Sequence, residues 1–332
     1  MLLWTEFLLL VAAIYFSGVR LSRYGDIIAE KSGLGRTWIG VVLLASITSL
    51  PELITGISSA SIMDLPDIAA GNVIGACCFN LLTLSLLDTF HAQTPISARA
   101  HPGHVLSASI GIFMLATVAF SLLLGSGIEP IGWVGFYTPV IIISYFAAMK
   151  LIYAYEKRQI RLMLKEAAEE PMYREVSTRH AAAMFSVNAA VVIIAAVFLP
   201  GTGGRIAAET GLGQVFVGNV IVTFATTLPE IVVSVSAMKI GAPDLAVGNL
   251  LGSNIFNILI LAVDDVFFAA GPILSFAGRQ HIFPLLFAIA MTAVAVIGLT
   301  YRAEKKRIFL AWDSFLIALL YFINVLVLYS AR

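Results

Sequence analysis

The sequence predicts an all-α polytopic membrane protein with ten transmembrane helices, arranged as two inverted five-helix repeats with broken helices 2 and 7. Three observations lead to this fold class: an apolar composition, ten windows of membrane-spanning length, and an internal repeat. Of the 332 residues, 59% are hydrophobic and 12% are charged, and the mean hydropathy is +0.94. Soluble domains carry about 25% charged residues. The composition therefore places the chain in a lipid bilayer.

Ten apolar windows are long enough to cross the hydrocarbon core, which takes about 20 residues of helix. In chain order the expected spans are Leu2–Val19, Trp38–Met63, Ile68–Leu87, Val105–Leu124, Ile131–Leu151, Ala181–Leu199, Val215–Ile240, Leu245–Val263, Ile282–Leu299 and Ile308–Tyr329.

The lysines and arginines predict the orientation, because cytoplasmic loops hold an excess of them. With the N-terminus outside, every basic residue except Arg205, Arg279 and Arg332 falls on the cytoplasmic side. We therefore expect a multi-pass protein of the cell (plasma) membrane with both termini extracytoplasmic. Its twenty basic and twenty acidic residues cancel, so the charge indicates no nucleic-acid partner. The lipid bilayer is the expected surrounding, and a monomer is the expected state.

Two segments of the first half recur in the second half. Residues 33–52, GLGRTWIGVVLLASITSLPE, match residues 211–230, GLGQVFVGNVIVTFATTLPE, at nine of twenty positions. Residues 66–80, PDIAAGNVIGACCFN, match residues 243–257, PDLAVGNLLGSNIFN, at eight of fifteen. Because each half has five spans, an odd number, the second half enters the membrane from the opposite side. Inverted repeats of this kind mark secondary transporters with a site near the midplane.

The repeat divides the chain into three parts. We expect an N-terminal transmembrane half with a repeat segment at about 34–88, a charged cytoplasmic linker, and a C-terminal transmembrane half with a repeat segment at about 212–265. These parts cover residues 1–152, 153–180 and 181–332. The linker is rich in Lys, Arg and Glu, which is typical of a solvated helix and loop.

A proline followed at once by a glutamate interrupts the second span, and the same pair interrupts the seventh. Pro51 and Pro229 have no N–H and push against the carbonyl four residues earlier, and in hydrocarbon a freed carbonyl needs a partner or a polar cavity. Glu52 and Glu230 each cost roughly 2.5–3.5 kcal/mol at the membrane centre. Carboxylate, hydroxyl and carbonyl oxygens are the ligands of hard cations such as Ca²⁺ and Na⁺. The repeated pair favours a site of charge −2 for one divalent cation.

Hydroxyls and amides accompany each glutamate. Thr48 precedes Glu52 by four residues and Thr226 precedes Glu230 by four, so each pair shares a helix face. The following spans carry one stripe each at positions i, i+4 and i+8: Asn72, Ala76 and Asn80, then Asn249, Ser253 and Asn257. Asp67 and Asp244 open these spans after a proline, where we expect them to cap the helix.

These motifs resemble the alpha repeats of the cation/calcium exchanger superfamily, most closely its prokaryotic sodium/calcium exchanger branch. The resemblance rests on TSLPE and TTLPE, on the paired GNxxG…FN segments and on the ten-span layout. It implies a secondary antiporter, not an enzyme, that exchanges sodium for calcium by alternating access as the first and sixth helices slide across a rigid core. It implies no cofactor, and calcium and sodium ions as the partners.

Position by position, the resemblance also implies a metal site shared between the halves. Its carboxylates are Glu52 and Glu230, and its main-chain ligands are the carbonyls of Ala45 (backbone) and Thr223 (backbone). The remaining expected ligands carry hydroxyl or amide oxygens: Thr48, Ser49, Thr226, Thr227, Asn80, Ser253 and Asn257.

The sequence departs from the family pattern in three ways. Ile47 and Ala225 stand where glycine is usual, which stiffens the broken turn. Ala76 stands where a serine ligand is expected, so one flanking sodium site lacks an oxygen and we expect weaker sodium dependence than in a serine-lined relative. Asn257 replaces the aspartate of potassium-dependent relatives, which keeps the site at −2.

Alternatives stay open at this point. A proton/calcium exchanger, or an exchanger of another divalent cation, uses the same glutamates, and a channel shares the same membrane layout. An intramembrane hydrolase is the alternative from another class, suggested by His101, His104 and Ser126. The loop between the histidines contains Pro102 and Gly103, so the two do not share a helix face as in H-E-x-x-H.

Overall fold

A computed structural model describes residues 2–31, 45–90, 93–163, 176–306 and 309–331, and within these ranges the chain is helical and contains no β-strand. Eight of the described helices are long and apolar enough to cross a membrane. They are α1 (Leu2–Lys31), α5 (Pro66–Leu87), α7 (His104–Leu124), α8 (Tyr137–Met163), α9 (Thr178–Thr210), α13 (Pro243–Phe267), α15 (Ile282–Tyr301) and α16 (Trp312–Ser330).

A ninth span is broken where the sequence predicts it. It consists of α10 (Gln214–Phe216), the π-helix η4 (Val217–Val222), α11 (Thr223–Thr226) and α12 (Leu228–Lys239), and it bends by 48° between α11 and α12. Of the predicted span 38–63, the described part forms α3 (Ala45–Thr48) and α4 (Leu50–Ser61), and residues 38–44 lie outside the described ranges. Short helices complete the connections: η2 (Asp88–Phe90), α6 (Ile96–Arg99), η3 (Gly125–Gly127), α14 (Ile273–Phe276) and η5 (Arg279–His281).

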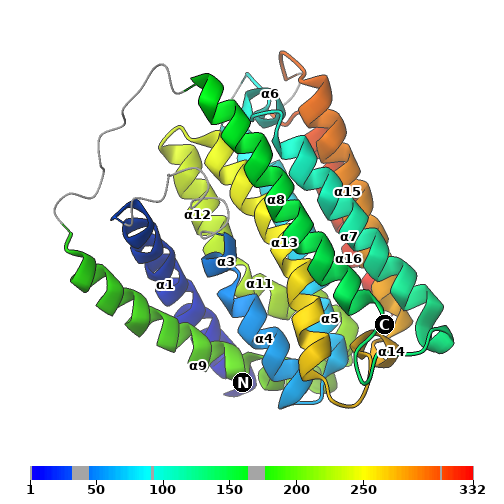
Figure 1. The fold of residues 1–332 in the computed structure, drawn as a ribbon. Helices are drawn as coiled ribbons and strands as arrows, with labels where there is room; N and C mark the ends of the chain where they lie inside the picture. The colour runs from blue at the N-terminus through cyan, green and yellow to red at the C-terminus, as the bar shows by residue number, and fades with distance from the viewer. Residues whose placement is uncertain (1, 32–44, 91–92, 164–175, 307–308, 332) are drawn as a thin grey trace.

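Two apolar clusters hold the helices together. The larger one surrounds the deeply buried helices α5 and α13 and includes side chains of α7, α8, α15 and α16. The smaller one joins α1 and α9 to η4, to Ala225 of α11 and to Ile68 of α5, through residues such as Ile14, Leu199 and Val217. Figure 1 shows α1 and α9 along one flank of the bundle, beside the broken helices. The chain therefore has a packed core and a two-helix flank with an apolar cluster of its own.

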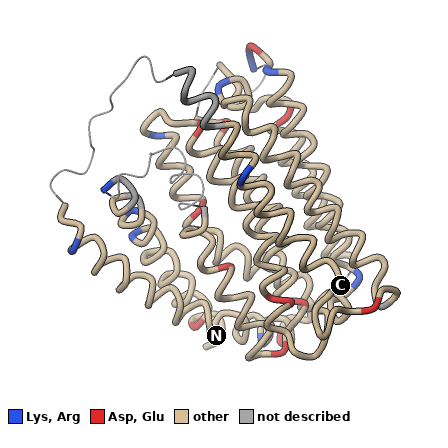
Figure 2. Tube along the Cα trace, viewed as in Figure 1, with Lys and Arg blue, Asp and Glu red and all other residues tan. Residues whose placement is uncertain are grey.

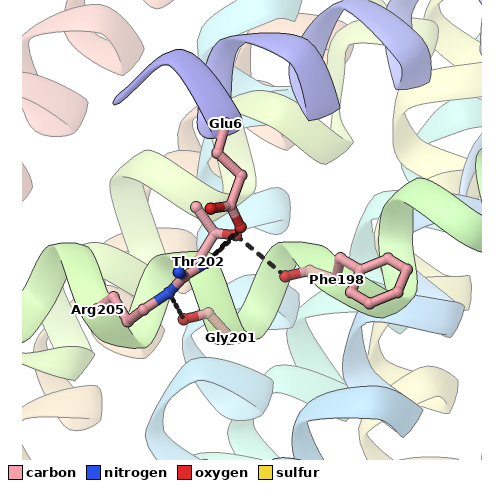
Figure 3. Close-up of polar contacts among 5 residues, drawn as sticks. All are labelled: Glu6, Phe198, Gly201, Thr202 and Arg205. Atoms are coloured by element: carbon pink, nitrogen blue, oxygen red, sulfur yellow. Dashed lines mark hydrogen bonds and ion pairs between the residues drawn. The ribbon is translucent and has the colours of Figure 1, made fainter. Parts of the chain in front are cut away.

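A polar contact fixes α1 to α9 at the end near the N-terminus (Figure 3). The hydroxyl of Thr202 donates to Glu6 Oε1 over 2.7 Å, and the guanidinium of Arg205 forms an ion pair with the same carboxylate. Arg205 also donates to the carbonyl of Gly201 over 3.4 Å. Since these groups lie on the two flanking helices, the contact joins them into one unit.

The sixth span runs past the predicted end at Leu199. Pro200 lies inside α9, which continues to Thr210. A proline in a helix frees the carbonyl four residues earlier, here that of Ala196. The hydroxyl of Thr55 on α4 donates to this carbonyl over 3.4 Å. The hydroxyl of Ser58 donates to the carbonyl of the following residue, Val197, over 2.7 Å. Partners on a neighbouring helix therefore allow α9 to continue.

The fifth span begins later than predicted. The expectation placed its start at Ile131, but α8 begins at Tyr137 and ends at Met163. Residues Ile131 and Val134 form an isolated antiparallel bridge, and Gly132 has a φ of +68°. A left-handed glycine suits this tight turn and does not fit a helix. The apolar part of α8 ends at Tyr155, so its last turns extend beyond a membrane span.

Candidate cation-binding site

Two breaks of similar geometry carry the two glutamates. The residue between α3 and α4 is Ser49, with φ −86° and ψ 13°, and the residue between α11 and α12 is Thr227, with φ −80° and ψ 0°. In each case proline is the second residue of the following helix and glutamate the third. The backbone therefore turns in the same way before Glu52 and before Glu230.

Both glutamate side chains are fully buried, at 0% exposure. Ser49 donates from its hydroxyl to Glu230 Oε1 over 2.9 Å, which links the first break to the second glutamate. Glu52 and Glu230 lie close enough for their charges to interact. Within the described ranges, Glu230 Oε2 and both carboxylate oxygens of Glu52 have no hydrogen-bond partner. Two buried acids without a cationic partner are costly unless a cation neutralises them.

Hydroxyls from each break reach the asparagine stripe of the opposite half. Thr226 Oγ1 donates to Asn72 Oδ1 over 2.9 Å, and Thr48 Oγ1 lies 3.5 Å from Asn249 Oδ1. The amide of Asn72 also donates to the carbonyl of Glu52 over 3.3 Å. The two stripes therefore hold the broken helices in place around the glutamates.

The later positions of each stripe, from Ala76 and Ser253 onward, present further buried polar atoms. Asn80 Nδ2 donates to Asn254 Oδ1 over 3.0 Å, and Asn254 Nδ2 donates to the carbonyl of Cys77 over 3.3 Å. Both polar atoms of Asn257, the hydroxyl of Ser253 and Asn80 Oδ1 are buried without a partner among the residues described. Ala76, the counterpart of Ser253, is buried and offers a methyl group.

The two expected main-chain ligands differ in surroundings. Ala45 is the first residue of α3. The Thr223 carbonyl accepts from Thr227 Oγ1 at 2.8 Å and from the Thr227 amide at 2.9 Å, and Thr226 Oγ1, which donates to Asn72, lies 3.2 Å from it. In this conformation the Thr226 and Thr227 hydroxyls would have to rotate before that carbonyl and their own oxygens could face an ion.

The donor set fits a hard cation. The partnerless buried oxygens belong to carboxylate, hydroxyl and amide groups, which are the ligands of Ca²⁺ and Na⁺. Among the described residues there is no group of three or more His, Cys, Asp or Glu side chains that could hold a metal ion. Two carboxylates with neutral oxygens suit calcium or sodium better than zinc or copper, which prefer imidazole and thiolate ligands.

Sequence reasoning missed three amide residues of this region as site members. Asn72 and Asn249 were recognised as stripe positions, but their contacts to Thr226 and Thr48 depend on how the halves pack. Asn254, which bonds to Asn80, follows Ser253 and so lies off the stripe defined by four-residue spacing. Its equivalent in the first repeat is Cys77, so the repeat carries no signal for it.

The expected helix caps at Asp67 and Asp244 are wrong, because neither α5 nor α13 has a side-chain cap. Asp67 Oδ1 accepts from the amide of Gly278 over 2.6 Å and contacts His281 Nε2 at 3.2 Å. Asp244 Oδ1 accepts from the amide of His101 and contacts His104 Nε2 at 3.2 Å. These aspartates bind loops of the opposite half, which provide better-placed donors than the first helical turn.

The family model for the sodium/calcium exchanger protein matches residues 2–153 and 180–330. The chain belongs to this family. The sodium/calcium exchanger MaX1 of Methanosarcina acetivorans is 26% identical to our exchanger over 339 residues, 91% of each chain. The Escherichia coli inner membrane protein YrbG is 24% identical over 266 residues, 79% of our chain and 78% of its own.

The fold of the exchanger is also similar to solved structures. The sodium-calcium exchanger NCX_Mj, soaked with Na⁺ and Sr²⁺, superposes with a TM-score of 0.63 at 22% identity and 98% coverage of both chains. The exchanger is thus a multi-pass membrane transporter of the cation/calcium exchange class and not an enzyme. The hydrolase alternative is wrong, and His101 and His104 instead contact Asp244.

Proposed function

We propose that the exchanger is a secondary active antiporter that moves calcium across the membrane against sodium by alternating access. Glu52 and Glu230 are the carboxylates that hold calcium. One observation carries this proposal: two fully buried glutamates, one at each broken helix, interact with each other and present three carboxylate oxygens without a partner in the described part of the chain. MaX1, a relative over most of the chain, is named for the same exchange.

The remaining ligands are proposed from the family resemblance and from their buried oxygens. Ser253 and Asn257 contribute buried oxygens without partners among the described residues, and Asn80 contributes its Oδ1. The hydroxyls of Thr48, Ser49, Thr226 and Thr227 and the carbonyls of Ala45 and Thr223 complete the set at the breaks. We propose that the chain uses no cofactor and functions as a monomer.

Repeated contacts support two inverted halves, at 1–152 and 181–332, joined by a linker at 153–180. Positions 177 apart correspond in the sequence repeat. Asp67 binds Gly278 and His281, and its counterpart Asp244 binds His101 and His104. These two pairs of partners also correspond to each other in the repeat. Likewise Asp88 accepts from the amide of Ile96 over 2.8 Å, and its counterpart Asp265 accepts from the amide of Ile273 over 2.7 Å.

The flanking pair α1 and α9 supports the alternating-access part of the proposal. It is joined internally through Glu6, Thr202 and Arg205, and it packs through an apolar cluster separate from that of the core. Gly18 of α1 lies against Pro229 at the second break. Movement of this pair across the breaks can therefore expose the site on one side at a time.

The charge distribution supports a plasma-membrane orientation with both termini outside. Figure 2 shows Lys and Arg gathered mainly toward the upper end of the bundle, away from the marked N-terminus, whereas acidic residues also occur within the bundle. Cytoplasmic ends of membrane proteins carry this excess of positive charge.

Calcium uptake into proteoliposomes under an outward sodium gradient, compared with an outward proton gradient, tests the proposed function. Sodium-driven uptake supports it, and uptake driven only by protons supports the proton/calcium alternative, in which the glutamates carry protons. Flux without counter-ion dependence supports a channel.

The sodium concentration for half-maximal exchange in wild type and Ala76→Ser tests the expectation for Ala76, because serine restores an oxygen at the position equivalent to Ser253.

Single cysteines at Asp64 and Lys239 should label from opposite sides of the membrane with an impermeant thiol reagent. Both residues follow an equivalent broken helix, but inverted halves place them on opposite faces. The two native cysteines, which are buried, are first replaced by Cys77→Ala and Cys78→Ala so that only the introduced thiol can react. Labelling of both positions from one side contradicts the inverted arrangement.

A further inference from the structure

Helix α13 carries two adjacent buried aspartates with opposite surroundings. Asp265 accepts hydrogen bonds from the amides of Gly135 and Ile273, each over 2.7 Å, and from the hydroxyls of Tyr137 and Thr138. Asp264 is equally buried, at 0% exposure, but neither of its carboxylate oxygens has a hydrogen-bond partner in the described ranges. Asp265 therefore organises the loops around it, and Asp264 has no such role.

A glycine on α4 makes room for the Asp264 carboxylate. A Cβ atom added at Gly56 would lie 2.4 Å from each of its oxygens, so no other residue fits there without displacing the acid. Gly56 follows Glu52 by four residues, which places it about 6 Å farther along the helix axis at 1.5 Å per residue. The acid thus lies about one helical turn from the level of a proposed calcium ligand.

The internal repeat indicates which of these residues the fold requires. Asp265 corresponds to Asp88, which is also satisfied: it accepts from the amides of Ile96 and Ala311 and pairs with Lys306. Asp264 corresponds to Leu87, and Gly56 corresponds to Ser234. The partnerless acid and its glycine therefore occur in one half only, and these two departures from the repeat contact each other. Since a leucine serves the same position in the other half, the helix packing does not need Asp264.

We propose that Asp264 is a proton-binding site coupled to the calcium site at Glu52 and Glu230, a step that rests on the proposed function. Without calcium, a proton neutralises this carboxylate, because an ionised group without a partner is costly in a dry interior. When calcium occupies the neighbouring site, its double charge favours the ionised form. The Asp264 O–H bond then breaks, the electron pair remains on the carboxylate oxygen, and the proton passes to water.

A proton fits Asp264 better than a sodium ion. Sodium requires several oxygens to replace its water, whereas no other polar group within the described ranges bonds to Asp264. The titratable groups near this end of α13 are Glu52 on α4, Tyr137 at the start of α8 and Asp265 itself, and α14 has none. Helices that pack along α13 also carry Asp67, Cys77, Cys78, Arg99, His104, Tyr145, Lys150, Tyr153, Tyr155, Glu230 and Lys239.

Counting the protons released when calcium binds tests the proposal. Purified full-length protein is titrated with calcium chloride in weakly buffered detergent solution at neutral pH. An indicator dye measures released protons, and calorimetry measures bound calcium. Because calcium binding displaces protons from the groups that it affects, we expect wild type to release about one proton per calcium ion more than Asp264→Asn. Asp264→Leu, which introduces the residue of the first repeat, should show the same loss and serves if the asparagine variant does not fold.

The outcomes separate this inference from the proposed function. Calcium binding in both proteins with equal proton counts overturns the role of Asp264 and leaves the calcium site intact. A wild type that binds no calcium overturns both. The titration is repeated with sodium chloride and with choline chloride at equal ionic strength. If the variants differ from wild type only in their response to sodium, Asp264 is a sodium ligand, and the proton proposal is overturned.

Discussion

Glu52→Gln or Glu230→Gln should lower the affinity for calcium at least thirtyfold and remove measurable calcium exchange. Each substitution preserves the side-chain shape but leaves a single negative charge facing a divalent ion. At an effective dielectric constant of about 20, one carboxylate about 4 Å from Ca²⁺ contributes roughly 8 kcal/mol of attraction. Even a net loss of about 2 kcal/mol corresponds to roughly a thirtyfold change in affinity. Calcium uptake into sodium-loaded proteoliposomes and calorimetric titration measure the two effects.

Glu129→Gln is the matched control, because it makes the same chemical change at an exposed position in the loop before α8. It should retain wild-type exchange. All three variants should elute as folded protein in size-exclusion chromatography. Wild-type calcium flux in either buried variant would reject the assignment of the site to the two glutamates.

Gly18→Ala should reduce the initial rate of exchange about 10- to 100-fold. An alanine Cβ at this position would lie 2.5 Å from Cγ of Pro229, a ring that cannot rotate away. Either α1 must move away from α12, or Pro229 must shift together with the adjacent Glu230. A misplacement of about 1 Å at a functional group can cost about 100-fold in rate. The measurement is again sodium-dependent calcium uptake, with the amount of protein in the vesicles determined for each variant.

Gly111→Ala on α7 provides the control for the added methyl group. A Cβ atom at Gly111 meets no other atom within 4 Å among the described residues, and alanine favours a helix over glycine by about 1 kcal/mol. This variant should exchange calcium at the wild-type rate and melt at the same or a higher temperature. Equal rates for Gly18→Ala and wild type would show that close contact between α1 and Pro229 is not needed for transport.

The broken helices could be predicted because their signals are local. Proline followed by glutamate occurs twice, and the structure places a turn before Glu52 and another before Glu230. The helical extension beyond Pro200 could not be predicted, because Thr55, the partner of the freed Ala196 carbonyl, and Ser58, which donates to Val197, come from a different helix. Helix boundaries that depend on tertiary hydrogen bonds are not encoded in the segment itself.

The site shows the same division between local and tertiary information. The glutamates and their hydroxyl neighbours follow from repeated motifs. The bonds of Asp67 and Asp244 to opposite loops required the packed structure, since the donors lie 211 and 143 residues away in the chain. No sequence signal distinguished Asp264 from Asp265. The difference appears only in the folded structure, where Asp265 accepts hydrogen bonds and Asp264 accepts none within the described ranges.

The two separate apolar clusters have a consequence for local opening of the protein. The cluster of α1, α9 and η4 shares none of its described residues with the cluster around α5 and α13. Contiguous cooperative units of a protein can open at a lower free energy than the whole. Backbone amides of α1 and α9 should therefore exchange with deuterium as a group and earlier than those of α5 and α13. In this membrane protein, the least protected amides would identify the helices that move.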